Sequence, residues 1–311
     1  MILDVKEVTK VYTKGKSSVI ANDNLSFSLK EGEVFGLFGH NGAGKTTLVK
    51  QIMGLSTPSS GEIQLLGKSV QEDTRRARSI CSLQPQSQLP LGFLTPTQAV
   101  TIMGKMRGVS KKEVKKRMQY LFNELDIDQW ANAEGNSLSG GIRRLTAFCM
   151  AVIVPGKLVI LDEPTNDVDP VRRRHLWKLI RELTTDGTSV ILVTHNVLEA
   201  EKAVDRMAIL HKGSFLAMGT PAEVKSSVSN LMRIELSLFR EDQGIEIPEC
   251  AVSLHREGGR IFFSVNQDAV LSVIEWAGKQ VERGNIINYS MSPATIEDVY
   301  VKLTTGKEMS A

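Results

Sequence analysis

Apolar and polar residues along the first 230 positions follow two different periods. Residues 2–8 and 25–29 alternate apolar and polar side chains, which predicts strands with one buried face. Helical patterns occur between the apolar runs, and Asp169-Pro170 provides the cap residue and first-turn proline of one such helix. The alternation of strands with helices predicts an α/β domain. Four runs are almost wholly apolar, as strands buried on both faces of a parallel sheet are: 34–38, 158–161, 190–193 and 207–210.

The pattern changes after about residue 226. Just before the change, Thr220-Pro221-Ala222-Glu223 has the form of a capping box and predicts a helix start. After a short polar linker we expect a small α+β domain, which divides the chain into domains 1–228 and 229–311. Its last helix is predicted to start at Ser292-Pro293 and to run through Tyr300. The other predicted elements are strands 231–238, 252–255 and 261–265, helix 268–278 and strand 286–290.

The composition narrows the class of protein. With 311 residues, 41% hydrophobic and 23% charged, the chain is globular, which excludes disordered, collagen-like and disulfide-stapled proteins. The longest mostly apolar stretch, residues 145–154, is about half of the ~20 residues that a membrane-spanning helix needs. The N-terminus lacks the apolar core of a signal peptide. Cys81, Cys149 and Cys250 lie far apart, which predicts buried structural thiols in a reducing compartment.

The net charge of +3 is unevenly distributed. Residues 231–311 hold 8 Lys/Arg against 12 Asp/Glu, a net charge of −4. The first 230 residues hold 30 against 23, a net charge of +7. The basic part therefore favours anionic partners, such as nucleotide phosphates, nucleic acid or an anionic membrane surface.

One segment, Gly39-His40-Asn41-Gly42-Ala43-Gly44-Lys45-Thr46, matches the phosphate-binding pattern GxxxxGK[ST]. It lies between an apolar strand and a helix-like stretch, which is the context that the pattern requires. Its glycines let backbone N–H groups turn inward around phosphate oxygens at a helix N-terminus. Lys45 is placed to neutralise the β- and γ-phosphates, and the Thr46 hydroxyl suits Mg²⁺. We include His40 and Thr47 in the nucleotide site, although each alone is typical of a loop residue and a helix cap, respectively.

A pair of acidic residues completes the expected chemistry. Asp162 and Glu163 follow the apolar strand 158–161. Asp162 is expected to hold the Mg²⁺ coordination sphere, and Glu163 to polarise the water that attacks the γ-phosphate. Two solvated acids after a strand are common in isolation, but their combination with the phosphate loop predicts a nucleotide-hydrolysing enzyme.

The stretch Ser137-Leu138-Ser139-Gly140-Gly141 distinguishes among the phosphate-loop families. Ser139 stands 23 residues before Asp162, and the stretch resembles the LSGGQ signature of the ATP-binding-cassette (ABC) ATPases. The other motifs of that family occur in the correct order. They are Tyr12 for the aromatic that stacks on adenine, Gln86 for the Q-loop, Asn166-Asp167-Val168-Asp169 for the D-loop, and Thr194-His195 for the H-loop.

The resemblance implies a mixed-sheet P-loop core with a helical subdomain at about residues 88–150. It further implies that Ser139, Gly140 and Gly141 serve the γ-phosphate bound by an opposite subunit, so the active site is composite. Gln86 is expected to offer its amide oxygen to Mg²⁺ and its amide nitrogen to water, with Gln84 as the competing choice.

Two residues of these family motifs, Tyr12 and Asp169, have other interpretations when each is taken alone. Tyr12 alone is typical of a core tyrosine at a strand edge. Asp169 is included in the nucleotide site, and alone it is equally well explained as the N-cap of a helix. His195 is expected to contact the γ-phosphate and hold the water.

The sequence departs from the family pattern at two points. Ile142 occupies the position where the signature usually has glutamine, and Asp167-Val168 replaces the commoner Gly-Leu. We expect the ATPase activity to be altered by these two changes but hydrolysis to be retained, because Lys45, Asp162, Glu163 and His195 are all present.

The end of the chain resembles one branch of the family. Residues 292–300 are similar to the SP-x-LEDVF/Y ending of ATPases from bacterial multidrug, antibiotic-resistance, lipid or sodium exporters. This resemblance implies an ATP-hydrolysing subunit that drives a separate transmembrane permease. Such a subunit pairs with a second copy or a close paralogue around two Mg-ATP. It would lie in the cytoplasm, attached peripherally to the membrane through the permease.

The alternative is an ABC ATPase without a transporter, such as a ribosome-binding factor, a DNA-repair ATPase or an assembly factor. Ribosome-acting members usually carry two cassettes, and DNA-repair members insert a long coiled coil, and neither feature occurs here. A nucleic-acid partner would favour a larger positive excess than +7 and a basic tail, so no nucleic acid is expected.

Overall fold

The computed structural model describes residues 1–15, 17–87, 90–226, 231–240, 244–293, 295–296 and 299. The chain divides into two compact units, Met1–Pro221 and Ala222–Ala311. The predicted domain border at residues 228 and 229 falls among residues 227–230, outside the described part of the chain.

A six-stranded sheet forms the centre of the first unit, with the strand order β10-β9-β3-β8-β7-β6. All neighbours are parallel except β10, which pairs antiparallel with β9. The four apolar runs predicted as buried strands are β3, β7, β8 and β9, and every residue of β3, β7 and β8 is buried. Strand bounds are β3 Val34–Phe38, β6 Cys81–Gln84, β7 Leu158–Asp162, β8 Ser189–Thr194, β9 Arg206–His211 and β10 Ser214–Gly219.

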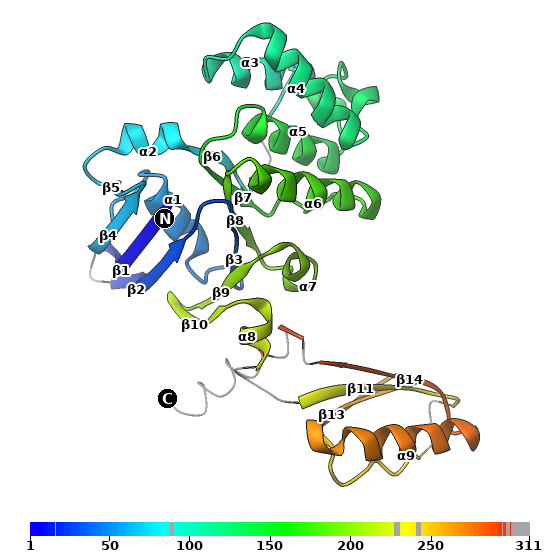
Figure 1. Ribbon diagram of the computed structural model, residues 1–311. Helices are drawn as coiled ribbons and strands as arrows, with labels where there is room; N and C mark the ends of the chain where they lie inside the picture. The colour runs from blue at the N-terminus through cyan, green and yellow to red at the C-terminus, as the bar shows by residue number, and fades with distance from the viewer. Residues whose placement is uncertain are drawn as a thin grey trace. The chain divides into compact units, whose positions relative to one another are not determined.

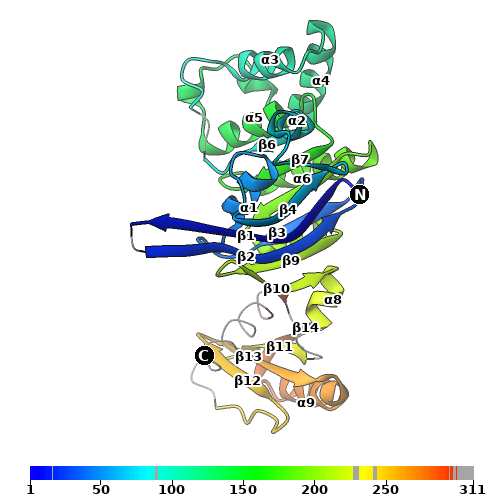
Figure 2. The ribbon, with the colours of Figure 1, turned by 90° about the vertical axis from the view of Figure 1, so that its left-hand side faces the viewer.

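A second, antiparallel sheet packs against helix α1 (Lys45–Ile52) and one face of the central sheet. The two predicted alternating strands are its β1 and β2, which are longer than the sequence pattern suggested and extend beyond the neighbouring strands (Figure 2). The order is β2-β1-β4-β5, with β1 Leu3–Lys14, β2 Ser17–Leu29, β4 Ser60–Leu65 and β5 Lys68–Ser69.

Helices α3, α4 and α5 gather at one end of the first unit (Figure 1). Thr95 and Ser110 begin α3 and α4 with capping boxes, in which side chain and backbone satisfy each other's hydrogen bonds. Asp169 is the N-cap of α6 and Pro170 is its first residue, as the sequence predicted. Helix bounds are α2 Thr74–Ile80, α3 Pro96–Met106, α4 Lys111–Glu124, α5 Gly140–Val152, α6 Pro170–Thr185, α7 Val197–Ala200 and α8 Pro221–Ser226.

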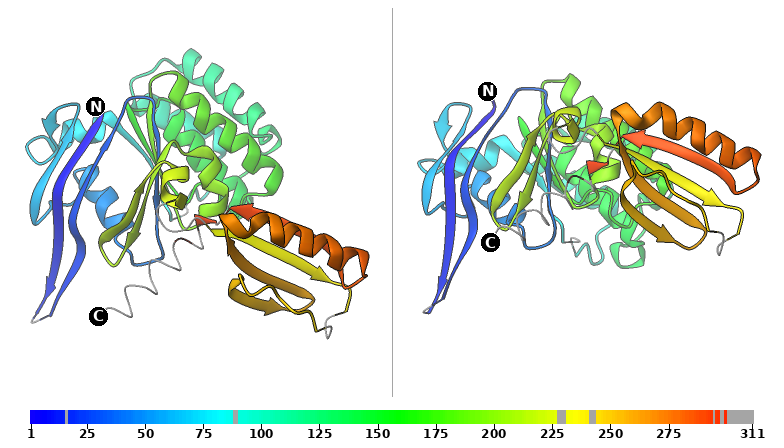
Figure 3. Two further views of the ribbon diagram at one scale, coloured as in Figure 1. Left: turned by 60° about the horizontal axis from the view of Figure 1, so that its bottom comes forward. Right: turned by 90° about the horizontal axis from the view of Figure 1, so that it is seen from below.

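The second unit is an α+β module, as predicted. Its four-stranded antiparallel sheet has the order β12-β13-β11-β14, and α9 lies along the sheet (Figure 3). Val273 and Ala277 of α9 pack on Ile234 and Phe263 of the sheet. Bounds are β11 Leu231–Leu238, β12 Val252–Glu257, β13 Arg260–Asn266, α9 Val270–Glu282 and β14 Ile286–Pro293.

The predicted start of the last helix is wrong. Ser292 and Pro293 belong to β14, where Pro293 pairs with Met232 of β11. Ser-Pro is a helix-start signal, but β14 is an edge strand, which tolerates a proline that cannot donate a backbone hydrogen bond. Further along the predicted helix, Ile296 and Val299 are helical, whereas residues 294, 297, 298 and 300 lie outside the described part of the chain.

Two of the three cysteines are buried, and the expectation for the third was wrong. Cys81 and Cys149 are buried free thiols, and burial raises the pKa of Cys81 to about 12. Cys250 is exposed because it lies in a turn after Pro248 and outside any apolar run. Among the described residues, no helix combines the length and apolar character needed to cross a membrane.

Candidate functional site

Five parallel strands of the central sheet end at one edge. Because β8 lies between β3 and β7, the segments after these three strands are neighbours in space. The carboxyl edge of a parallel sheet is where such folds bind ligands. The residues that follow β9, β3, β8, β7 and β6 include, in that order, Lys212, the loop 39–44, His195, Glu163 and Gln86.

A cavity of about 660 Å³ opens at this edge. Among the predicted residues it brings together most of the phosphate loop, the acidic pair and the Q-loop glutamine. Its lining consists of Val19, Ile20, Ala21, Asn41, Gly42, Ala43, Gly44, Lys45, Thr46, Thr47, Gln86, Asp162, Glu163 and Lys212.

The phosphate loop requires glycine at two crowded positions. Gly44 has φ +109°, and a Cβ there would lie 2.2 Å from the carbonyl oxygen of Ala21. A Cβ on Gly39 would lie 2.3 Å from the carbonyl oxygen of Leu210. Gly44 is also the N-cap of α1 and makes no side-chain capping bond, so the first N–H groups of this helix remain available to an anion.

Lys45 is the cation of the cavity that the sequence predicted. Its Nζ donates to the carbonyl oxygens of Gly39, at 2.5 Å, and His40, at 3.1 Å. These two residues do not line the cavity, but they hold the lysine that does. Burial lowers the pKa of Lys45, against the opposing charges of Glu163 and Asp162.

Asp162 lies at the end of β7 with only 5% of its surface exposed. Burial and the charge of Glu163 raise the pKa of Asp162 to about 6, although Lys45 and Arg144 oppose the shift. Two carboxylates next to one ammonium group leave an excess of negative charge, which a divalent cation would offset.

Glu163 is buried and accepts hydrogen bonds through both of its carboxylate oxygens. Oε2 accepts from the hydroxyl of Thr194 at 2.7 Å, and Oε1 accepts from the backbone N–H of His195 at 2.9 Å. The Nδ1 atom of His195 lies 2.6 Å from Oε1. An ionised carboxylate only accepts, so this contact requires the proton of His195 on Nδ1. The structure therefore joins the predicted H-loop histidine to the predicted water-polarising acid.

The two candidate glutamines have different surroundings. Gln86 lines the cavity, whereas Gln84 is fully buried and donates through Nε2 to the carbonyl oxygen of Arg144 at 3.2 Å. The guanidinium of Arg144 in turn donates to the carbonyl oxygen of Gln86 at 2.8 Å, which ties α5 to the loop that carries Gln86.

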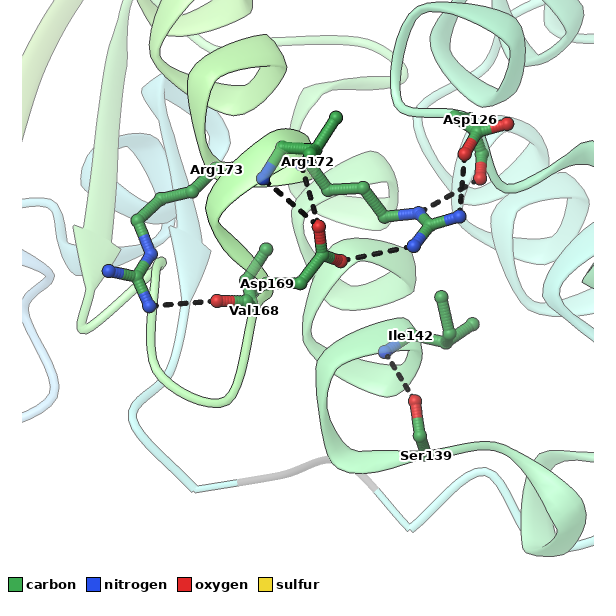
Figure 4. Close-up of polar contacts among 8 residues, drawn as sticks. Asp126, Ser139, Ile142, Val168, Asp169, Arg172 and Arg173 are labelled. Atoms are coloured by element: carbon green, nitrogen blue, oxygen red, sulfur yellow. Dashed lines mark hydrogen bonds and ion pairs between the residues drawn. The ribbon is translucent and has the colours of Figure 1, made fainter.

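Several predicted residues do not line the cavity. Tyr12 is 45% exposed on β1 and pairs with Val19 of β2, and the ammonium of Lys10 lies 5.1 Å from its ring centroid. Ser139, Gly140, Gly141 and Asp169 occupy the starts of α5 and α6 (Figure 4).

Ser139 caps α5 by accepting from the backbone N–H of Ile142 at 3.3 Å. Ile142 is buried, so the residue that replaces the usual glutamine belongs to the protein core. In the same way, Asp169 caps α6 by accepting from the N–H groups of Val171 and Arg172, each at 3.1 Å.

Four lining residues were not predicted from the sequence: Val19, Ile20, Ala21 and Lys212. Val19 and Ile20, 63% and 53% exposed, line the cavity from β2, and Lys212 follows β9 in a left-handed conformation with φ +46°. The pairing of β1 with β2, and of β9 with β10, places these residues. A period-2 pattern reveals a strand but not its neighbour.

A glycine-rich loop between strand and helix, facing two carboxylates at the carboxyl edge of a parallel sheet, defines a P-loop nucleotide-binding protein. The family model described as ABC transporter matches residues 22–166. The chain is 31% identical over 312 residues to the Nod factor export ATP-binding protein I of Neorhizobium galegae, covering 99% of this chain and 86% of that protein. The chain therefore belongs to the ATP-binding proteins of the ABC transporter family, and it binds ATP.

Solved structures share the same fold. An ATP-binding subunit of an ABC transporter matches with a TM-score of 0.67 and 26% identity, over 73% of this chain and 93% of that one. A dimeric ATP-binding cassette with bound ADP and Pi matches with a TM-score of 0.64 and 25% identity, over 70% of this chain and 98% of that one. These likenesses confirm the predicted ABC-type fold.

Proposed function

We propose that this chain is the ATP-hydrolysing subunit of an ABC exporter and drives a separate transmembrane permease. Support for the exporter comes from the relatives named Nod factor export ATP-binding protein, which match 99% of this chain and therefore include its second unit. The observation that carries the hydrolytic function is the contact of Glu163 with His195 beside Lys45 and the phosphate loop.

The proposed nucleotide site needs Mg²⁺, and the residues present fit this ion. Thr46, Gln86 and Asp162 contribute a hydroxyl, an amide and a carboxylate to one cavity, and Mg²⁺ prefers such oxygen ligands. The raised pKa of Asp162 indicates a carboxylate that gains from a nearby cation. When bound, the ion neutralises charge on the β- and γ-phosphates.

The other residues have distinct proposed roles. Lys45 and the N–H groups of residues 41–47 bind the phosphates, and Glu163 accepts a proton from the attacking water while His195 orients it. Tyr12 stacks on adenine from β1, where it pairs with Val19, and the cavity-lining residues Val19 and Ile20 provide additional apolar contacts.

We further propose that two such chains form the working enzyme, as a homodimer or with a close paralogue. Ser139, Gly140, Gly141 and Asp169 lie outside the cavity of their own chain, so they would serve a nucleotide held by the partner. The similar dimeric cassette supports this arrangement. The pair would lie at the cytoplasmic face of the membrane, bound to the permease.

The substitution Glu163→Gln tests the hydrolytic role. The amide keeps the shape of the side chain but cannot accept a proton, so we expect ATP turnover to fall about 100-fold or more while ATP binding persists. The variant should also form a dimer in the presence of ATP, measured by size-exclusion chromatography. Glu72→Gln, at an exposed position, is the matched control. Normal turnover by Glu163→Gln, or the absence of an ATP-dependent dimer, would contradict the proposal.

A further inference from the structure

Arg172, in the first turn of α6, holds three groups at once. Its NH2 lies 2.6 Å from the Oδ2 atom of Asp126, and its Nε donates to the carbonyl oxygen of the same residue at 3.0 Å. Its NH1 donates to the Oδ2 atom of Asp169 at 3.0 Å. The guanidinium carbon also lies 4.9 Å from the ring centroid of Trp130. The planar fork of arginine suits this multiple contact, which a single ammonium group could not make.

These partners come from two different parts of the first unit. Asp126 follows α4 and has a left-handed backbone, with φ +53°, and Trp130 ends the next helical turn. Asp169 ends the D-loop segment, residues 166–169, which leads from Glu163 into α6. Arg172 therefore connects the D-loop segment to the end of α4, as Figure 4 shows.

The D-loop segment contacts the proposed catalytic residue Glu163 on one side and the start of α5 on the other. The N–H of Asn166 donates to the carbonyl oxygen of Glu163 at 3.4 Å. A Cβ on Gly141 would lie 2.4 Å from the carbonyl oxygen of Asp167, so the first turn of α5 packs directly on this segment. A displacement of the segment would therefore reach both Glu163 and the start of α5.

Arg172 also fixes the side chain of Asp169. Burial raises the pKa of Asp169, but the hydrogen bonds and positive charge of Arg172 outweigh burial and keep the pKa below its usual value. The carboxylate thus stays ionised, with one oxygen on the helix N–H groups and the other on the guanidinium.

The next residue, Arg173, holds the D-loop segment from the opposite direction. Its NH2 donates to the carbonyl oxygen of Val168 at 2.8 Å, and it forms an ion pair with Glu199 of α7. Because α7 begins two residues after His195, consecutive arginines connect the segment to α4 and to the H-loop.

We propose that Arg172 is a positioning residue for ATP hydrolysis: it holds the D-loop segment in register with the end of α4. This role rests on the proposed ATPase function. The ion pair itself adds little stability, because 64% of the Asp126 side chain is exposed and surface pairs are weak. Neither Arg172 nor its partners line the nucleotide cavity, so the role concerns turnover and leaves ATP binding unaffected.

The test compares Arg172→Ala with Arg174→Ala in the full chain with Mg-ATP. Arg174 is exposed on the same helix, so its removal changes the charge equally without breaking the contacts. For Arg172→Ala we expect kcat to fall about tenfold with KM for ATP within about twofold of wild type, since misplaced groups slow the chemical step. Arg172→Lys should recover part of the loss, because an ammonium group pairs with one carboxylate at a time.

A double-mutant cycle identifies the partner. Asp126→Ala should lower kcat to a similar extent, and the double variant should be no slower than either single variant, as for two residues in one contact. Melting temperatures of all variants separate this effect from loss of folded protein.

Three outcomes would overturn the inference. They are equal kcat for Arg172→Ala and Arg174→Ala, a rise in KM with kcat unchanged, or a fall in kcat that only matches loss of folded protein. A wild-type chain that fails to hydrolyse ATP would instead refute the proposed function.

Discussion

The two glycine-rich segments of the first unit differ in what surrounds them. The phosphate loop faces Asp162 and Glu163 of its own chain across one cavity. Ser139 and Gly140 begin α5 outside that cavity, and Gly141 packs against the backbone of Asp167. One chain thus holds the groups expected to bind the nucleotide in its cavity. The signature segment, residues 139–141, belongs to a separate surface that it forms with the D-loop segment.

This difference implies that binding and turnover can be damaged independently. Changes in the phosphate loop should remove ATP binding. Changes in the signature and D-loop surface should leave binding intact and slow hydrolysis, because we propose that this surface acts on a nucleotide held by the partner chain. Substitutions on the two sides therefore test the comparison directly.

The largest effect is expected from Lys45→Ala. The variant removes the cation that lies between the carbonyl oxygens of residues 39 and 40 and the two carboxylates. Loss of one partner from a buried charged contact costs roughly 2–5 kcal/mol, so the Kd for ATP should rise about 100-fold. Isothermal titration calorimetry measures the change. Lys50→Ala, exposed on the same helix, should bind ATP normally, and a Kd for Lys45→Ala within threefold of wild type would refute the assignment.

Gly141→Ala should have a smaller effect, and it should change the rate of turnover instead of the affinity for ATP. The new methyl group would meet the carbonyl oxygen of Asp167 at 2.4 Å and displace the D-loop segment. We expect kcat to fall roughly tenfold with the Kd for ATP unchanged. Gly278→Ala is the matched control, because its Cβ would meet nothing within 4 Å in helix α9. Weakened ATP binding by Gly141→Ala would show that the two surfaces are not separable.

Local sequence determined the parts of this site that could be predicted. Residues 39–46 and the pair Asp162-Glu163 each follow a buried strand, so a strand, turn and helix pattern suffices to identify them. The order of the strands depends on contacts between distant segments. For this reason the sequence indicated His195 only through its resemblance to a family motif, and not through its contact with Glu163.

The same limit explains what was missed. Arg172 appeared only as one of three consecutive arginines in a helix, and its partner Asp126 is 46 residues away. Val19 and Lys212 reach the cavity through strand pairing, which the apolar pattern does not specify. Ser292-Pro293 was misassigned because the same dipeptide suits a helix start and an edge strand.

The smallest predicted effect concerns the stability of the cavity without nucleotide or metal. Because the pKa of Asp162 is raised to about 6 in the folded chain, the folded state binds a proton more tightly than the unfolded state does. Stability must therefore fall as the pH rises through the window from about 4 to 6, and the cost is complete above it. Asp162→Asn removes this cost, so we expect a gain of about 1 kcal/mol at pH 8 after allowance for solvent screening, or roughly 2–4 °C in Tm.

The gain should shrink as the pH falls below 6, where wild-type Asp162 takes up its proton and also becomes neutral. Thermal melts at pH 8 and pH 4.5 in chelator measure it, with Asp268→Asn, at an exposed position, as the control. An equal gain in stability at both pH values would mean that the charge of Asp162 is not what destabilises the chain in the absence of nucleotide and metal. Mg²⁺ added at pH 8 together with ATP should stabilise the wild type more than Asp162→Asn, because only the carboxylate attracts the cation. Asp162 then has two opposite effects: its carboxylate lowers the stability of the chain without nucleotide and metal, and it favours the metal-bound state.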